Sequence, residues 1–154
     1  TGPAVVLGAG GAARAVCVAL QDAGVPEIRL INRTFARAES LAKTLGGNIL
    51  VGSWEDRTNQ LGDAAILVNT TTLGMLGQPP LNIDLARFNE DGLVADIVYS
   101  PLETPLLTAA CGRGLRAVDG LGMLLYQAQA GFEGWFGRKP EVTTALREHI
   151  LSAI

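Results

Sequence analysis

The feature that most constrains this chain is a glycine-rich turn between an apolar run and a helical pattern. Residues 4–7 read Ala-Val-Val-Leu, as expected for a strand buried on both faces. They lead directly into Gly8-Ala9-Gly10-Gly11-Ala12-Ala13, which has the spacing G-x-G-x-x-[GA]. Gly8 permits the tight turn, Gly10 leaves room for a pyrophosphate beside the backbone, and Ala13 lets the helix pack close to the strand. The turn predicts a dinucleotide site in which helical amides hold the phosphates, although such a turn also occurs without a ligand.

The residues after the second predicted strand, at 27–32, indicate which dinucleotide is bound. An NAD site places an Asp or Glu here to accept a hydrogen bond from the ribose 2′-hydroxyl. This chain instead has Asn32, Arg33 and Thr34, followed by Arg37, with no acidic residue among them. Two guanidiniums suit a 2′-phosphate, to which they can donate charge-assisted hydrogen bonds. The alternative is that Arg33 and Arg37 are solvated residues that open a helix, but cations are unfavourable in the first turn of a helix. We therefore expect NADP rather than NAD as the cofactor.

Apolar strands alternate with helical patterns along the chain. Besides the two strands above, the sequence predicts strands at 48–52, 64–69, 93–97 and 115–118. It predicts helices at 11–22, 34–45, 103–111 and 121–136, and a last helix from Pro140 onward. The alternation predicts an α/β protein with a doubly wound parallel six-stranded sheet, the Rossmann fold, in a single domain over residues 1–154.

Composition and charge narrow the range of partners. The formal net charge is −3 and no basic cluster interleaves with aromatic residues, which argues against a nucleic-acid partner. No apolar run is long enough to span a bilayer and no signal peptide precedes Thr1, so we expect a cytoplasmic protein without a membrane partner. Cys17 and Cys111 lack zinc-type spacing and fall in predicted helices, so we expect no metal site and two buried apolar cysteines.

Candidate ligand-binding residues follow the other strands, because a doubly wound sheet binds ligands beyond the carboxyl ends of its strands. Thr70, Thr71 and Thr72 either satisfy loop backbone groups or line a ribose and a nicotinamide. Tyr99 is either half-buried structure or a ligand-binding phenol at the rim of the sheet. Gln127 lies early in an apolar helix, where a structural amide is the alternative to a ligand-binding one.

These blocks resemble the NADP domain of shikimate dehydrogenases, in order and over essentially the whole chain. The similar blocks are residues 5–14, 32–38, 69–75, 96–99 and 119–128. The first two are also similar to glutamyl-tRNA reductases, which remain an alternative, as does a stand-alone NADP-binding module. The last two are more selective for the shikimate family. The resemblance implies the family reaction: reversible, NADP-dependent reduction of 3-dehydroshikimate to shikimate in aromatic amino-acid biosynthesis.

The resemblance also implies a role for each block. The pyrophosphate would be bound by Gly8, Ala9, Gly10, Gly11 and Ala12, and the 2′-phosphorylated ribose by Asn32, Arg33, Thr34 and Arg37. The nicotinamide would be bound by Ile97, Gly120 and Met123, with Thr70, Thr71 and Thr72 close by. Shikimate or 3-dehydroshikimate would be contacted by Tyr99 and Gln127.

One part of the family pattern is missing from this chain. Reducing a ketone requires a proton donor near its oxygen, and the family takes that lysine and its aspartate partner from a separate N-terminal substrate domain. Here the only lysines are Lys43 and Lys139, neither of them at a strand end. We therefore expect no catalytic residue in this chain, which should bind NADP without turnover, whereas a full-length protein would be an NADP-dependent oxidoreductase.

Overall fold

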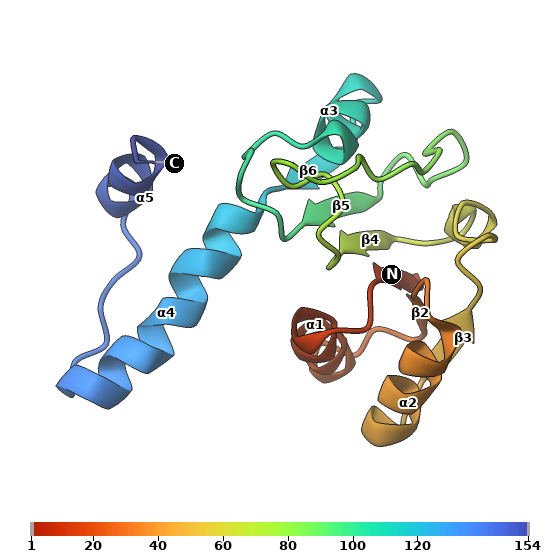
Figure 1. Ribbon diagram of the computed structural model, residues 1–154, viewed down its shortest axis with the longest axis horizontal. Helices are drawn as coiled ribbons and strands as arrows, with labels where there is room; N and C mark the ends of the chain where they lie inside the picture. The colour runs from red at the N-terminus through yellow and green to blue at the C-terminus, as the bar shows by residue number, and fades with distance from the viewer. Residues whose placement is uncertain (1, 154) are drawn as a thin grey trace.

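A six-stranded parallel sheet forms the centre of the computed structural model, which describes residues 2–153 (Figure 1). The strand order is β3-β2-β1-β4-β5-β6. The strands are β1 Ala4–Leu7, β2 Ile28–Ile31, β3 Ile49–Gly52, β4 Ile66–Asn69, β5 Leu93–Asp96 and β6 Arg116–Val118. The order reverses between β1 and β4, as in doubly wound folds, so the predicted Rossmann architecture is confirmed.

Helices cover the two faces of the sheet unequally. α1 (Gly11–Asp22) and α2 (Phe35–Leu45) lie on one face, and α3 (Pro105–Gly112) lies on the other with the short 3₁₀ helix η1 (Asn59–Leu61) nearby (Figure 1). Right-handed crossovers explain this, because connections running in opposite directions along the sheet fall on opposite faces. Each face has its own apolar core, one around Val5, Leu67 and Leu107 and the other around Val6, Cys17 and Leu30.

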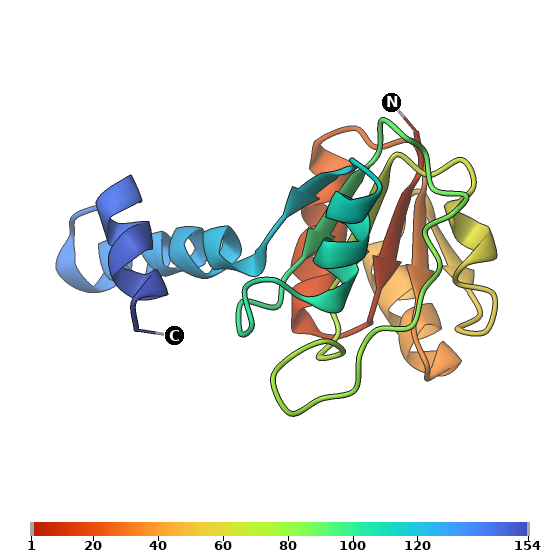
Figure 2. The ribbon, with the colours of Figure 1, turned by 90° about the horizontal axis from the view of Figure 1, so that it is seen from above.

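The last two helices extend away from the sheet (Figure 2). α4 (Gly120–Phe136) buries only its first two turns, and Trp135 and Phe136 near its end are 81% and 64% exposed. α5 (Thr144–Leu151) returns beside it. The prediction that this helix begins at Pro140 is wrong: Thr143 is the N-cap, and its hydroxyl accepts from the Leu146 amide at 3.1 Å.

The two cysteines differ from each other. Cys17 is buried as predicted, and desolvation raises the pKa of its thiol to about 11. Cys111 is exposed, so the prediction that it is buried is wrong, because it faces outward from α3 while Leu107 and Ala110 face the core. Within residues 2–153, no helix combines the length and the apolar character that crossing a membrane requires.

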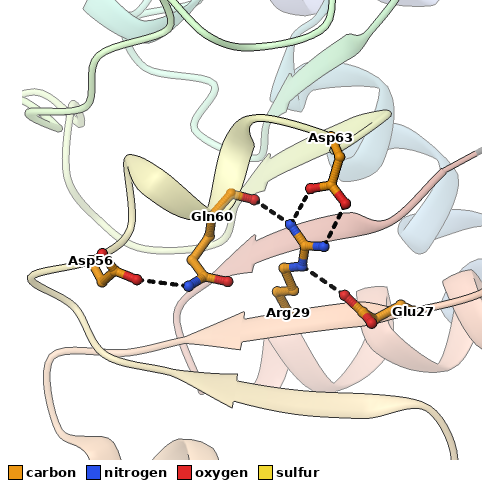
Figure 3. Close-up of polar contacts among 5 residues, drawn as sticks. All are labelled: Glu27, Arg29, Asp56, Gln60 and Asp63. Carbon is orange, nitrogen blue, oxygen red and sulfur yellow. Dashed lines mark hydrogen bonds and ion pairs between the residues drawn. The ribbon is translucent and has the colours of Figure 1, made fainter.

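Arg29 on β2 ties the sheet to the segment that crosses from β3 to β4 (Figure 3). Its guanidinium donates to Glu27 at 2.7 Å, to the Gln60 carbonyl at 2.7 Å and to both carboxylate oxygens of Asp63 at 2.5 and 2.9 Å. The Arg29 side chain is 17% exposed. A largely buried guanidinium requires hydrogen-bond partners, and the segment between β3 and β4 provides most of them through Gln60 and Asp63.

Replacing Arg29 with leucine is expected to lower the free energy of unfolding by about 1–2 kcal/mol, because several charged hydrogen bonds are lost. The hydrogen bond from Arg29 lowers the pKa of Asp63. The stabilisation by the Arg29–Asp63 contact is therefore fully present above the ordinary pKa of 3.8, and it is lost as the pH falls through the lower pKa of the folded state. Urea unfolding at neutral and acidic pH measures both effects. Asp63→Asn, at a more exposed partner, should cost less; a leucine variant as stable as the parent at neutral pH contradicts the assignment.

Candidate functional site

The turn from β1 into α1 combines one glycine that the fold requires with two that it does not. Gly8 has φ +110°, and a Cβ there would lie 2.6 Å from the Thr70 Oγ1. That hydroxyl donates to the Leu7 carbonyl at 2.6 Å, so Gly8 allows β1 and the loop after β4 to meet. A Cβ on Gly10 or Gly11 would meet nothing within 4 Å, and neither residue has a positive φ. The fold therefore gives no reason for glycine at these two positions.

The N-terminus of α1 has no cap from the protein itself. Gly10 is the N-cap, so no side chain accepts from the first helical amides, and the first turn contains no acidic residue. By contrast, Thr104, Asp119 and Thr143 cap α3, α4 and α5 through their side chains, whereas Thr34 at the start of α2 forms no such hydrogen bond. The first amides of α1 and the positive end of its dipole are therefore available to an anion.

A cavity of about 390 Å³ opens beside this turn, between α1 and α2. Its lining residues are Ala9, Gly10, Gly11, Arg14, Arg37, Ser40, Leu41 and Thr44. Among residues 2–153, neither Arg14 nor Arg37 forms an ion pair, and neither guanidinium donates a hydrogen bond. The cavity thus brings together two cations without an anion.

The structure changes the list of residues around this cavity. Of the four residues predicted to bind the 2′-phosphorylated ribose, Arg37 lines the cavity. Arg33 and Thr34 are exposed and do not line it. Asn32 does not line it either, and its side-chain amide donates to the Thr34 carbonyl at 2.8 Å. Arg14 was missed by sequence reasoning. The signal was present, because Arg14, like Arg37, lies near the start of a helix where cations are unfavourable.

A second cavity, of about 230 Å³, lies between the loops that follow β4 and β5. Its lining residues are Thr70, Thr71, Thr72, Met75, Ile97, Val98, Tyr99, Ser100 and Met123. The predicted threonine loop, Ile97, Tyr99 and Met123 are therefore brought together. Tyr99 is 37% exposed, so the residue is partly covered by the protein and partly in contact with solvent.

Gly120 and Gln127 do not line this second cavity. Gly120 has a packing reason to be glycine, since a Cβ there would lie 2.1 Å from the Ile97 carbonyl oxygen. Its own amide donates to the Val98 carbonyl at 3.2 Å, which holds the start of α4 against the loop that follows β5. Gln127 is exposed one helical turn beyond Met123, so both side chains lie on the same side of α4.

Two buried polar residues end the strands beneath the second cavity. Asn69 and Asp96 are register partners on β4 and β5, are 0% and 2% exposed, and are joined by a hydrogen bond of 2.9 Å. Burial raises the pKa of Asp96, while hydrogen bonds from Thr104, the Val98 amide and Asn69 act in the opposite direction. Sequence reasoning did not single out these residues, although a polar residue at the end of each of two buried strands was visible.

The comparison with protein families identifies two matches to one family. The sequence model described as "Shikimate / quinate 5-dehydrogenase" matches residues 2–75, and the one described as "Shikimate 5'-dehydrogenase C-terminal domain" matches residues 120–148. Proteins named "Shikimate dehydrogenase (NADP(+))" from Rhodospirillum rubrum and Paramagnetospirillum magneticum are 56% and 58% identical to the chain. The matches cover 97% and 99% of the chain, and 54% and 55% of those proteins. The chain thus spans about half the length of these relatives.

Solved structures of the same family share the fold. Shikimate 5-dehydrogenase from Thermus thermophilus, in complex with NADP(H) and shikimate, matches with a TM-score of 0.84 and 36% identity over 100% of this chain and 56% of that one. Quinate dehydrogenase from Corynebacterium glutamicum, in complex with NAD, matches with a TM-score of 0.89 and 31% identity over 98% of this chain and 55% of that one. By sequence and by fold, the chain belongs to the shikimate dehydrogenase family and includes the family's C-terminal domain.

Proposed function

We propose that this chain is the NADP-binding part of a shikimate dehydrogenase, which interconverts 3-dehydroshikimate and shikimate. The observation that carries the proposal is the pair Gly10 and Gly11, which the packing of the chain does not require. Glycine loses more backbone entropy on folding than any other residue, so glycines that packing does not require need another reason, such as a ligand close to the backbone. A pyrophosphate on the uncapped amides of α1 supplies that reason.

The assignment of the cofactor follows from the charges beside the turn. Residues 8–12 would hold the pyrophosphate, and Arg37 would hold the 2′-phosphate together with Asn32, Arg33 and Thr34. Arg14 joins this set because it lines the same cavity as Arg37. Two guanidiniums without a protein anion fit a dianionic phosphate and have no such partner on an unphosphorylated ribose.

The nicotinamide end would lie at the second cavity. The loop at 70–72 together with Ile97 and Met123 would contact the ring, and Gly120 would hold the start of α4 next to it. The bound nicotinamide would supply the hydride that the ketone accepts. Tyr99 lines this cavity, and Gln127 lies one turn further along α4, so both are proposed to contact shikimate hydroxyls or its carboxylate.

Neither lysine of the chain lies at this site, and the described residues present surfaces suited to a further domain. Lys43 lies on α2 and Lys139 lies between α4 and α5, and neither lines the two cavities. The sheet face over β4–β6 is open beside α1, with an apolar hollow of about 300 Å³, and α4 exposes large aromatic side chains. We propose that residues 1–154 act as a cofactor domain on which a substrate domain completes the active site.

Titration calorimetry of the chain with NADP and with NAD tests the cofactor assignment. We expect NADP to bind at least about tenfold more tightly, because one charged phosphate contact contributes roughly 1.5–3 kcal/mol. Adenosine 2′,5′-bisphosphate, which lacks the nicotinamide, should retain the 2′-phosphate contribution. Equal affinity for NADP and NAD would falsify the 2′-phosphate assignment.

A chimera tests the substrate assignment. The chain alone should not reduce NADP in the presence of shikimate, whereas fusing it to the remaining half of the Rhodospirillum rubrum relative should give shikimate-dependent NADP reduction. In that chimera Tyr99→Phe and Gln127→Ala should each raise the KM for shikimate by about tenfold, the value of one hydrogen bond, with little change in the KM for NADP. Unchanged KM values for shikimate would contradict the roles of both residues.

A further inference from the structure

The second cavity is formed by two loops without regular secondary structure, together with Met123 of α4. The loop at 70–75 follows β4, the loop at 97–100 follows β5, and the cavity lies between them. Binding at such a site depends on how firmly the two loops are fixed, because ordering them on binding costs free energy.

Asn69 fixes the first loop from below. Its side-chain oxygen accepts from the Thr71 amide at 3.0 Å and from the Thr71 hydroxyl at 2.7 Å, and its side-chain nitrogen donates to the Leu73 carbonyl at 3.1 Å. The same nitrogen donates to Asp96 at 2.9 Å. The conformation of the threonine loop is therefore connected directly to the end of β5.

Asp96 fixes the second loop and joins it to α3. One carboxylate oxygen accepts from the Val98 amide at 3.1 Å as well as from Asn69, and the other accepts from the Thr104 hydroxyl at 2.7 Å. The Thr104 hydroxyl also caps α3 by accepting from the Leu107 amide at 3.3 Å. A single carboxylate thus connects the two loops and a helix N-terminus.

We propose that Asp96 is a positioning residue for the nicotinamide end of the cofactor: it fixes the two loops that face each other across the second cavity. The inference rests on the proposed function, since it assumes that the nicotinamide lies there. A carboxylate is required because all three groups that Asp96 contacts are donors. An asparagine would place an NH₂ group toward the Thr104 hydroxyl, which then has no acceptor for its own proton.

Asp96→Asn is expected to weaken NADP binding by about tenfold while changing the affinity for adenosine 2′,5′-bisphosphate less than about twofold. Adenosine 2′,5′-bisphosphate lacks the nicotinamide half, so under the proposed function it would contact only the glycine turn and the arginines, and its binding tests that function by itself. Calorimetry with both ligands gives the ratio of affinities for each variant. If the parent chain binds neither ligand, the proposed function fails. If the parent binds both and Asp96→Asn weakens both equally, the role of Asp96 fails.

A second pair of variants keeps the test valid if Asp96→Asn does not fold. Thr104→Val removes the hydroxyl that Asp96 accepts from, and Thr104→Ser retains it. Thr104→Val should lower the affinity for NADP more than the affinity for adenosine 2′,5′-bisphosphate. Thr104→Ser should keep the ratio of the two affinities at the value of the parent chain. Leu61→Ala, which removes a fully buried side chain elsewhere in the core, is the control for general destabilisation and should leave the ratio unchanged. A serine variant that behaves like the valine variant, or a Leu61 variant that shifts the ratio equally, overturns the inference.

Discussion

Replacing Gly10 with valine is expected to weaken NADP binding by at least about 100-fold while changing the free energy of unfolding by no more than about 1 kcal/mol. A Cβ at this position meets nothing within 4 Å in the chain, and the backbone conformation of φ −97° and ψ −167° is open to any residue. The added methyl groups would instead occupy the space through which a pyrophosphate approaches the α1 amides. Thermal unfolding and calorimetry on the same sample measure the two quantities.

Gly8→Ala is the matched comparison, because its main cost is expected to fall on the free energy of unfolding. Its Cβ would lie 2.6 Å from the Thr70 hydroxyl at a residue with φ +110°, so the cost falls on folding and should reach roughly 2–4 kcal/mol. The two glycines lie in one turn, yet one serves the fold and the other the proposed ligand. A Gly10→Val variant that binds NADP as the parent does contradicts the assignment of the pyrophosphate to this turn.

Removing Arg33 and Arg37 together is expected to lower NADP affinity by about 100-fold or more while leaving NAD affinity within about threefold, because charged contacts to a 2′-phosphate contribute roughly 1.5–3 kcal/mol each. Arg14→Ala alone should lower NADP affinity by about tenfold for the same reason, since Arg14 and Arg37 line one cavity. Calorimetry with NADP and NAD for the double variant and the single variant gives both values.

Lys43→Ala controls for the loss of a positive charge on α2. Lys43 is exposed on the same helix as Arg37 but does not line the cavity, so this variant should keep the preference for NADP over NAD. A loss of affinity shared equally by NADP and NAD in the arginine variants would mean that the guanidiniums act on the rest of the nucleotide. The two cofactors must be measured side by side because solved relatives of this fold include complexes with NADP(H) and with NAD.

The central strands β1, β2 and β4 were predictable from the sequence because they are short, largely apolar runs that the sheet buries, whereas the edge strand β6 is exposed. β1 reads Ala-Val-Val-Leu with all four residues buried, and the glycine turn and α1 follow at the predicted positions. The start of α5 was not predictable in the same way. Pro140 is a favourable first helical residue, but the Thr143 hydroxyl caps the helix later in the chain. Two plausible start signals lay within one turn, and local sequence does not rank them.

The residues of the candidate site that directly follow the carboxyl end of a strand were predictable from the sequence. The threonine loop, Ile97, Tyr99 and Met123 do line one cavity, because the ends of neighbouring parallel strands meet at one edge of the sheet. Arg14 is visible in the sequence as a cation near a helix start, but only the packing of α1 against α2 shows that it shares a cavity with Arg37. In the same way, only the register of β4 and β5 shows that Asn69 and Asp96 are paired. Contacts between elements of this kind cannot be read from the local sequence of either partner. The family matches then favour a shikimate dehydrogenase over the glutamyl-tRNA reductase alternative.

The most direct test of phosphate binding at the glycine turn is a titration of ¹⁵N-labelled chain with NADP, followed through the backbone amide signals. We expect the largest chemical-shift changes on the amides of Gly10, Gly11 and Ala12, and we expect them to disappear in Gly10→Val. A titration in which NADP binds while these three amides keep their positions would place the phosphates elsewhere and contradict the assignment of this turn.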